Sequence, residues 1–224
     1  MAIVPIPLGE YPMCDYRFRF FRIFSMVAVV LFGASCSAGT EGVAQPAVDD
    51  TTTSVAGKAP ERKVSEPLDI SPYLSRPCEL VSPEMLAKLG TSPSEATPRL
   101  PEDHKVSAEF GPSCDWSGED EGGIGVNINS GNKERGLGGL RGHEMARDQG
   151  RYELWEETSI SSYPAVYLGV SDARDRGDCE LVVGIADDMT FGVSAVSFYE
   201  NPEKACRVAD EVAADVIETL KSGS

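Results

Sequence analysis

The chain offers two histidines, His104 and His143, as candidate general bases or metal ligands. His143 and Glu144 begin the pattern HExxH, but Arg147 occupies the position of the second histidine, so a zinc-protease helix is not predicted. We expect His143 to be an exposed residue of a helix. No serine lies in a GxSxG turn, and the glycines between 136 and 139 do not form a phosphate-binding loop. These residues predict no catalytic site, no metal site and no cofactor.

Carboxylates are plentiful, notably at 119–121 and in the run SDARDRGDCE at 171–180. That run lacks the ligand register and the terminal glutamate of an EF-hand loop, so weak surface calcium binding is its less favoured alternative. Two facing carboxylates about 5–9 Å apart could hydrolyse a glycosidic bond. Nothing in the spacing indicates such a pair, but an unrecognised envelope hydrolase remains the alternative function.

Six cysteines are the other reactive side chains. Cys14 and Cys36 belong to the N-terminal segment, which leaves four in the remainder of the chain. An even number in an exported chain predicts two disulfides, and the lack of CxxC spacing argues against a zinc ribbon or a redox site. Three connectivities are possible, and pairing of nearest neighbours has the lowest loop-closure cost. The favoured pairs are Cys78–Cys114 and Cys179–Cys206.

The N-terminal segment has the layout of a secretory signal. Three arginines precede an uncharged stretch, IFSMVAVVLFGAS at 23–35, which ends at Cys36. This stretch spans only about 20 Å as a helix, less than the roughly 30 Å hydrocarbon core, so a permanent membrane span is less favoured. The residues before Cys36 resemble a bacterial lipobox, although Gly33 replaces the usual branched aliphatic residue. We predict a signal peptide at 1–36 with Cys36 acylated; cleavage without lipid and translation from Met13 remain alternatives.

Acylation of Cys36 would place the protein at the cell membrane, anchored by lipid on the extracytoplasmic face. Residues 37–67 contain no aromatic residue, no Leu or Ile, and no apolar periodicity. Such a segment buries too little apolar surface to offset its ordering entropy, so we predict a flexible tether.

The composition also restricts the possible partners. A formal net charge of -16 and a pI near 4.5 argue against nucleic acid, because phosphates need a cationic face. Binding to an anionic membrane through a basic patch is disfavoured for the same reason. Hydrophobic residues make up 41% of the chain, which is enough for a packed core.

Residues 68–224 are predicted to form one domain. Its first helix is expected at 82–89, with Ser82 as N-cap, Pro83 at the first position and Gly90 as the stop. Residues 91–102 read as a loop. Apolar residues at strand spacing predict strands at 106–110, 114–117, 124–128, 152–156, 165–170, 180–186 and 191–199. Asp187 and Asp188 indicate a tight hairpin turn between the last two.

Two further helices complete the predicted domain. The middle one covers 133–149, although each of its glycines costs about 1 kcal/mol of helix stability. The last begins with Asn201 as cap and Pro202 at the first position. Its apolar stripe consists of Ala205, Val208, Ala209, Val212, Ala213, Val216, Ile217 and Leu220. The predicted fold class is α+β: a mostly antiparallel sheet with a capping N-terminal helix, a middle helix and a long C-terminal helix, stapled by two disulfides.

Several of these features occur together in one known family. They are the lipobox-like start, the tether, PCELVSPEMLAKLG from Pro77, GPSCDW around Cys114, SYPAV at 162–166, CELVVGIADD from Cys179, and a cysteine in the last helix. In this combination the chain resembles the actinobacterial lipoproteins of domain-of-unknown-function family 3558. The resemblance covers about 71–220. It implies an envelope lipoprotein with a disulfide-bonded domain and no established activity.

The favoured function is therefore a non-catalytic envelope module that binds or senses a protein, glycan or lipid ligand. A cleft with two facing carboxylates would favour the hydrolase instead, whereas an exposed apolar groove would favour binding. Trp116 lies two residues after Cys114. We expect it to pack on the disulfide instead of stacking on a sugar.

Overall fold

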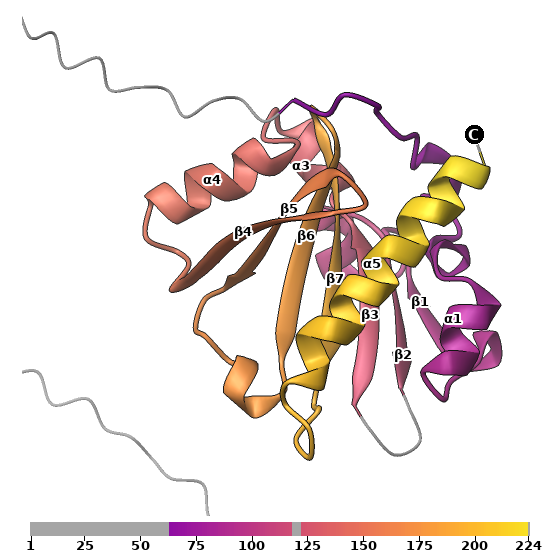
Figure 1. Cartoon of the computed structure of the whole chain (residues 1–224). Coiled ribbons are helices and arrows are strands. Elements are labelled where there is room, and N and C mark those ends of the chain that lie inside the picture. Colours follow the sequence, from indigo (N-terminus) through magenta and orange to yellow (C-terminus); the bar gives the residue numbers. More distant parts are fainter. Residues whose placement is uncertain (1–62, 118–121, 224) are drawn as a thin grey trace, which may run out of the picture. The chain divides into compact units, whose positions relative to one another are not determined.

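The computed structural model describes residues 63–117 and 122–223 (Figure 1). Their strands form one antiparallel seven-stranded sheet in the order β1-β2-β3-β7-β6-β5-β4. The strands are β1 (Ala96–Arg99), β2 (Ser113–Ser117), β3 (Gly123–Ile128), β4 (Leu154–Ile160), β5 (Tyr163–Gly169), β6 (Cys179–Ala186) and β7 (Met189–Val196). The helices are α1 (Pro83–Lys88), α2 (Lys105–Phe110), α3 (Ser130–Glu134), α4 (Leu140–Asp148) and α5 (Lys204–Ser222). The predicted α+β class is confirmed.

The long helix α5 covers one face of the sheet, which it crosses diagonally in Figure 1. All eight residues of its predicted apolar stripe are buried. They pack against alternate strand residues such as Leu181, Val183 and Val193, which are also fully buried. The helix starts later than predicted. Asn201 accepts a hydrogen bond from the Lys204 backbone N–H in a preceding turn, so Glu203 takes the N-cap position.

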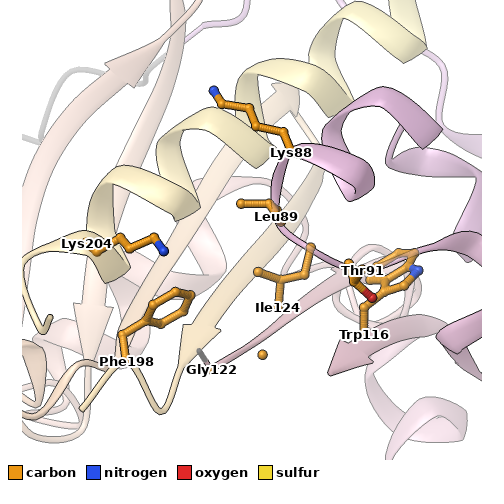
Figure 2. A pocket seen from close by; sticks show the side chains of 9 residues that line it. Lys88, Leu89, Thr91, Trp116, Gly122, Ile124, Phe198 and Lys204 are labelled. Atoms are coloured by element: carbon orange, nitrogen blue, oxygen red, sulfur yellow. The ribbon is translucent and has the colours of Figure 1, made fainter. Parts of the chain in front are cut away.

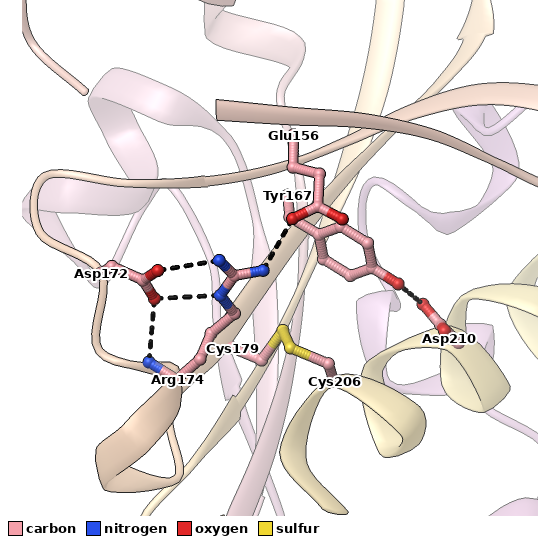
Figure 3. A network of polar contacts seen from close by, with 7 residues as sticks. All are labelled: Glu156, Tyr167, Asp172, Arg174, Cys179, Cys206 and Asp210. Carbon is pink, nitrogen blue, oxygen red and sulfur yellow. Dashed lines mark hydrogen bonds and ion pairs between the residues drawn. A yellow bond between two sulfur atoms is a disulfide. The ribbon is translucent and has the colours of Figure 1, made fainter. Parts of the chain in front are cut away.

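Both predicted disulfides are present. Cys78, in the short 3-10 helix Pro77–Leu80, is joined to Cys114 in β2. Cys179, the first residue of β6, is joined to Cys206 in the first turn of α5, as Figure 3 shows. One bond joins the 3-10 helix to β2 and the other joins α5 to β6, so both have a structural role.

Two predictions between the first helix and β2 were wrong. Residues 106–110 form α2 and not a strand, because the Ala108 and Gly111 N–H groups donate to the carbonyls of His104 and Ser107 within a helical turn. Val106 and Phe110 are 58% and 43% exposed. The apolar spacing that predicted a strand therefore belongs to side chains on the exposed surface of a short helix. The predicted loop 91–102 contains β1, which pairs with β2 at the edge of the sheet.

The middle helix is broken into α3 and α4. Gly136 and Gly139 have φ of 69° and 67°, a conformation that other residues rarely adopt. Gly138 and Gly139 also lie so close to the Asp188 and Asp187 carbonyls that a Cβ on either would clash. The glycines therefore end one helix and seat the connecting loop on the β6–β7 hairpin turn, which occurs at Asp187 and Asp188 as predicted. β4 begins and ends later than the predicted 152–156.

The end of the predicted tether belongs to the folded domain. Val64 is buried, and its N–H donates to Asp187 Oδ1 over 3.2 Å. The Tyr163 hydroxyl donates to the Glu66 carbonyl over 2.9 Å. The domain therefore starts at least as early as Val64, upstream of the predicted boundary at 68. Cys36, the signal peptide and residues 37–62 of the tether lie outside the described residues. Within the described ranges, no helix is long and apolar enough to cross a bilayer.

Candidate functional site

The face of the sheet opposite α5 carries small and polar side chains. Asp115 in β2 is in register with Gly125 in β3, Gly125 with Ser194 in β7, and Ser194 with Glu180 in β6. These four residues form one row across the central strands, on the face opposite the buried residues that contact α5. Polar and buried residues lie on opposite faces because successive side chains of a strand point to opposite sides of the sheet.

A cleft of about 670 Å³ is lined by the two ends of this row, Asp115 and Glu180, and Ser194 lines the hollow next to it. Val106 and Phe110 from α2 line one side, and His143 and Met145 from α4 line another; Leu137 comes from the loop between α3 and α4. Val106, Phe110, Leu137 and Met145 are all substantially exposed, at 37–58%. The cleft therefore combines apolar walls with a polar floor.

Glycines in the floor allow polar side chains to lie flat across neighbouring strands. A Cβ on Gly125 would lie 2.6 Å from Asp115 Oδ1, so the aspartate side chain reaches over β3. In the same way the Asn127 carboxamide lies over Gly192 of β7. Larger residues at either position would displace these polar groups from the floor.

A hydrogen-bond chain fixes the Asn127 amide. Its Nδ2 donates to Asn129 Oδ1 over 2.8 Å, and Asn129 Nδ2 donates to Thr190 Oγ1 over 2.9 Å. Asn129 and Thr190 are buried, at 6% and 1% exposure. This bond orients the Asn127 carboxamide, whose Oδ1 lies over Gly192 in the cleft floor.

At one end of the cleft, Arg99 in β1 is engaged by protein groups. Its Nε donates to Asp115 Oδ2 over 2.6 Å, and its Nη1 lies 3.4 Å from His104 Nε2. The His104 Nδ1 lies 3.3 Å from the Ser107 hydroxyl. Both histidines thus line the same cleft, although the sequence indicated no relation between them.

Glu180 lies where the cleft meets a second hollow. Its side chain is exposed to solvent inside the cleft, and desolvation by the surrounding protein raises its pKa above the ordinary value. Among the described residues its carboxylate has no ion-pair or hydrogen-bond partner. A ligand that donates a hydrogen bond would therefore be favoured at this position.

The prediction of an exposed His143 was wrong. Its ring is directed into the layer between α4 and the sheet, where Nδ1 lies 3.4 Å from the Tyr152 hydroxyl. Its Nε2 is buried and has no hydrogen-bond partner among the described residues. Burial lowers the pKa of His143 to about 4, so the imidazole is neutral at neutral pH. His143 lies on a helix as predicted, but α4 packs on the sheet through the face that carries Leu140 and His143.

The second hollow, of about 300 Å³, shares Glu180 with the cleft and is mainly apolar. Its apolar lining includes Leu154, Leu168, Val170 and Val196. Seven large apolar side chains are exposed in the described part of the chain, and six of them line either the cleft or this hollow. Exposed apolar surface is thus concentrated along one groove, here defined as the cleft together with the adjoining hollow.

Two other places are weaker candidates. A hollow of about 70 Å³ lies between α1, α5 and the β2–β3 hairpin, with Lys88 and Lys204 beside Leu89 and Phe198 (Figure 2). It is too small for a ligand much larger than a few waters. Trp116 lines it but is only 2% exposed, so it is a core residue, not a sugar platform.

The acidic run at 171–180 does not form a calcium site. Both Asp172 oxygens accept hydrogen bonds from Arg174, which also donates to Glu156 (Figure 3). Asp178 accepts from the Ser197 N–H. Throughout 63–117 and 122–223, no group of three or more His, Cys, Asp or Glu side chains is placed to hold a metal ion.

The cleft does not present the facing carboxylates of a glycoside hydrolase. Asp115 and Glu180 are separated by three strand spacings, which places their Cα atoms roughly 14 Å apart. Asp115 is also held by Arg99. The geometry required for a carboxylate pair is roughly 5–9.5 Å between the two carboxyl groups.

The fold and groove define a disulfide-bonded α+β domain with an open, amphiphilic groove on one face of its sheet. The chain belongs to the family described as "Protein of unknown function (DUF3558)", whose model matches residues 31–219. Comparison with curated proteins and with solved structures gave no match.

Proposed function

We propose that this protein is an exported, lipid-anchored binding module, and that the groove opposite α5 holds its ligand. The observation that carries the proposal is that six of the seven large apolar side chains exposed within 63–117 and 122–223 lie along that groove. When a ligand covers exposed apolar surface, the free energy of the complex is lowered. Single apolar side chains scattered over the surface would not indicate a binding site.

Export and lipid anchoring are supported by the sequence of the first 36 residues. The arginines, the short apolar stretch and Cys36 occur in the order of a lipoprotein signal. The family match begins at residue 31 and so includes Cys36. Two disulfides in the domain are consistent with an oxidising compartment.

A binding role is favoured over hydrolysis by the chemistry of the groove. Asp115 and Glu180 are too far apart to act as a pair, and His143 is partly buried beside Tyr152 with its Nε2 inaccessible to solvent. The fixed Asn127 amide and the apolar walls are suited to holding a molecule without reacting with it.

The test uses the protein purified from its own envelope with and without a blocked groove. Ser194→Phe places a large side chain in the central row, and Ser222→Phe, at the exposed end of α5, is the matched control. Mass spectrometry of molecules released on denaturation should find a compound carried by wild type and Ser222→Phe but lost from Ser194→Phe. Circular dichroism must first show that both variants fold. The same compound on all three proteins would contradict the proposed site.

A further inference from the structure

The oxygens presented by the cleft floor are hydrogen-bond acceptors. Asp115 uses Oδ2 for Arg99 and lays Oδ1 over Gly125. Asn127 uses its amide nitrogen for Asn129 and leaves its oxygen over Gly192. The Glu180 carboxylate is the third acceptor. A molecule that fits this floor must supply several donors.

These acceptors are spaced along the ligand's path. The Asp115 oxygen lies over β3, the Asn127 oxygen over β7, and Glu180 extends from β6, which is the next strand. With neighbouring strands about 5 Å apart, the three acceptors span roughly 10 Å. Asn127 lies two residues along β3 from the row that contains Asp115 and Glu180, so one ammonium group can satisfy only part of this set. A chain of hydroxyl groups, as in a short oligosaccharide, can satisfy all of it.

The charges of the cleft favour an uncharged head group. Its lining holds two carboxylates, Asp115 and Glu180, and two arginines, Arg99 and Arg151. Arg99 is already engaged by Asp115. The other two, Glu180 and Arg151, also sum to zero, so the lining carries no net charge that would attract an ionic head group.

The adjoining hollow has a different chemistry. Val170 is 79% exposed and Val196 is 42% exposed, and Leu154 and Leu168 lie behind them in the same hollow. None of these side chains can hydrogen-bond to a sugar, but each loses exposed apolar area when a hydrocarbon chain covers it. Because Glu180 lines both hollows, one molecule can occupy the two together.

We propose that the groove takes an uncharged glycolipid, with its sugar hydroxyls over Asp115, Asn127 and Glu180 and its hydrocarbon chain against Val170 and Val196. This inference rests on the proposed function, because it names the ligand class of the same groove. A free oligosaccharide would use the cleft alone, and a lipid without a sugar would use the hollow alone.

Binding of simple probes distinguishes a glycolipid from a free sugar and from a lipid without a sugar. Calorimetric titrations below the micelle concentration would use dodecyl glycosides with glucose, galactose, mannose and maltose heads, the corresponding free sugars, and a dodecyl chain with a polyoxyethylene head. At least one dodecyl glycoside should bind ten times more tightly than both its free sugar and the polyoxyethylene lipid.

Variants at exposed positions test each half of the groove. Val170→Asp should reduce the affinity for that glycoside about tenfold, to the level of the free sugar, and leave sugar binding unchanged. Glu180→Ala should weaken the glycoside and the free sugar by the same factor. Tyr199→Asp is the matched control and should bind as wild type does, because Tyr199 is a large apolar side chain, 71% exposed, that lies outside the groove.

Three results would overturn the ligand class. They are binding of no glycoside in the panel, equal affinity for a glycoside and its free sugar, and equal affinity for the polyoxyethylene lipid. If the envelope-derived compound is nevertheless lost from Ser194→Phe, the groove is the binding site and only the ligand class is wrong. If a protein partner is lost from that variant instead, the occupant is a polypeptide.

Discussion

The imidazole of His143 links the stability of the α4 layer to pH. Its Nε2 is buried without a partner, and burial lowers its pKa to about 4, below the value of about 6.5 for an unfolded chain. The folded state therefore binds this proton less readily than the unfolded state. The stability linked to neutral His143 is fully present above pH 6.5, and it is lost as the pH falls towards 4.

His143→Leu should remove this dependence. Leucine fills similar space without a buried nitrogen, so the variant should gain free energy of unfolding relative to wild type as the pH drops from 7.5 to 5. The relative gain should be about 2 kcal/mol. Urea unfolding at the two pH values measures it. An NMR titration of His143 with a midpoint near 6.5 would contradict the buried, neutral histidine.

Single residues show both what a sequence can reveal and what it cannot. Ser82 was recognised as an N-cap from local spacing, and its Oγ accepts from the Met85 N–H over 3.1 Å. Asp115, Asn127 and Glu180 were not recognised as one site, because they come from three strands that are separated in sequence. Alternation with apolar neighbours places each on a polar face, but only the strand order brings the three together.

At the scale of elements, α5 is the main support of the core. Val216 is fully buried on its sheet-facing side, whereas Glu218 has a side chain 68% exposed. Val216→Asp removes apolar burial and forces a carboxylate into the core, so it should lower the free energy of unfolding by about 3–5 kcal/mol. Glu218→Ala should change it by less than about 0.5 kcal/mol. Thermal melts of the two variants decide; equal small shifts would mean that α5 does not pack as described.

The two disulfides should contribute similar stability. They close segments with sequence separations of 36 and 27, for which chain-entropy loss in the unfolded state predicts about 3–4 kcal/mol each. Replacing Cys179 and Cys206 together by serine should cost about that amount, measured by denaturant unfolding. Peptide mapping without reductant should recover Cys78 with Cys114 and Cys179 with Cys206. Crossed pairs would contradict the connectivity.

Long periodic elements were predictable, and short ones were not. The α5 stripe repeats over several turns, so its buried face was correct even though the start was two residues off. α2 has only six residues, too few to separate a helical from a strand period. β1 contains a proline and has mostly exposed side chains, and it depends on β2 for its hydrogen bonds. The sequence of residues 96–99 alone does not indicate that they pair with β2.

At the scale of the whole molecule, the proposed anchor determines where the domain acts. We expect Cys36 to be diacylated and to be the mature first residue, because a cationic, an apolar and a small-residue segment precede it in that order. Mass spectrometry of protein extracted from membranes should find the lipidated N-terminus. Cys36→Ala should release the protein into the medium or block processing. An unmodified N-terminus at another residue would contradict the anchor.

The two disulfides lie one after the other along the chain and do not link its halves. A single cut between Cys114 and Cys179 would leave no covalent bond between the fragments, even without a reducing agent. Only noncovalent contacts, such as strand pairing and the Ser82–Asp215 hydrogen bonds to α5, would then hold them together. The groove draws Asp115 from one fragment and Glu180 from the other. A protease that nicked this segment would thus separate the two sides of the cleft once the pairing failed. If Cys36 is acylated as proposed, only the piece with the N-terminal segment would stay attached to the membrane.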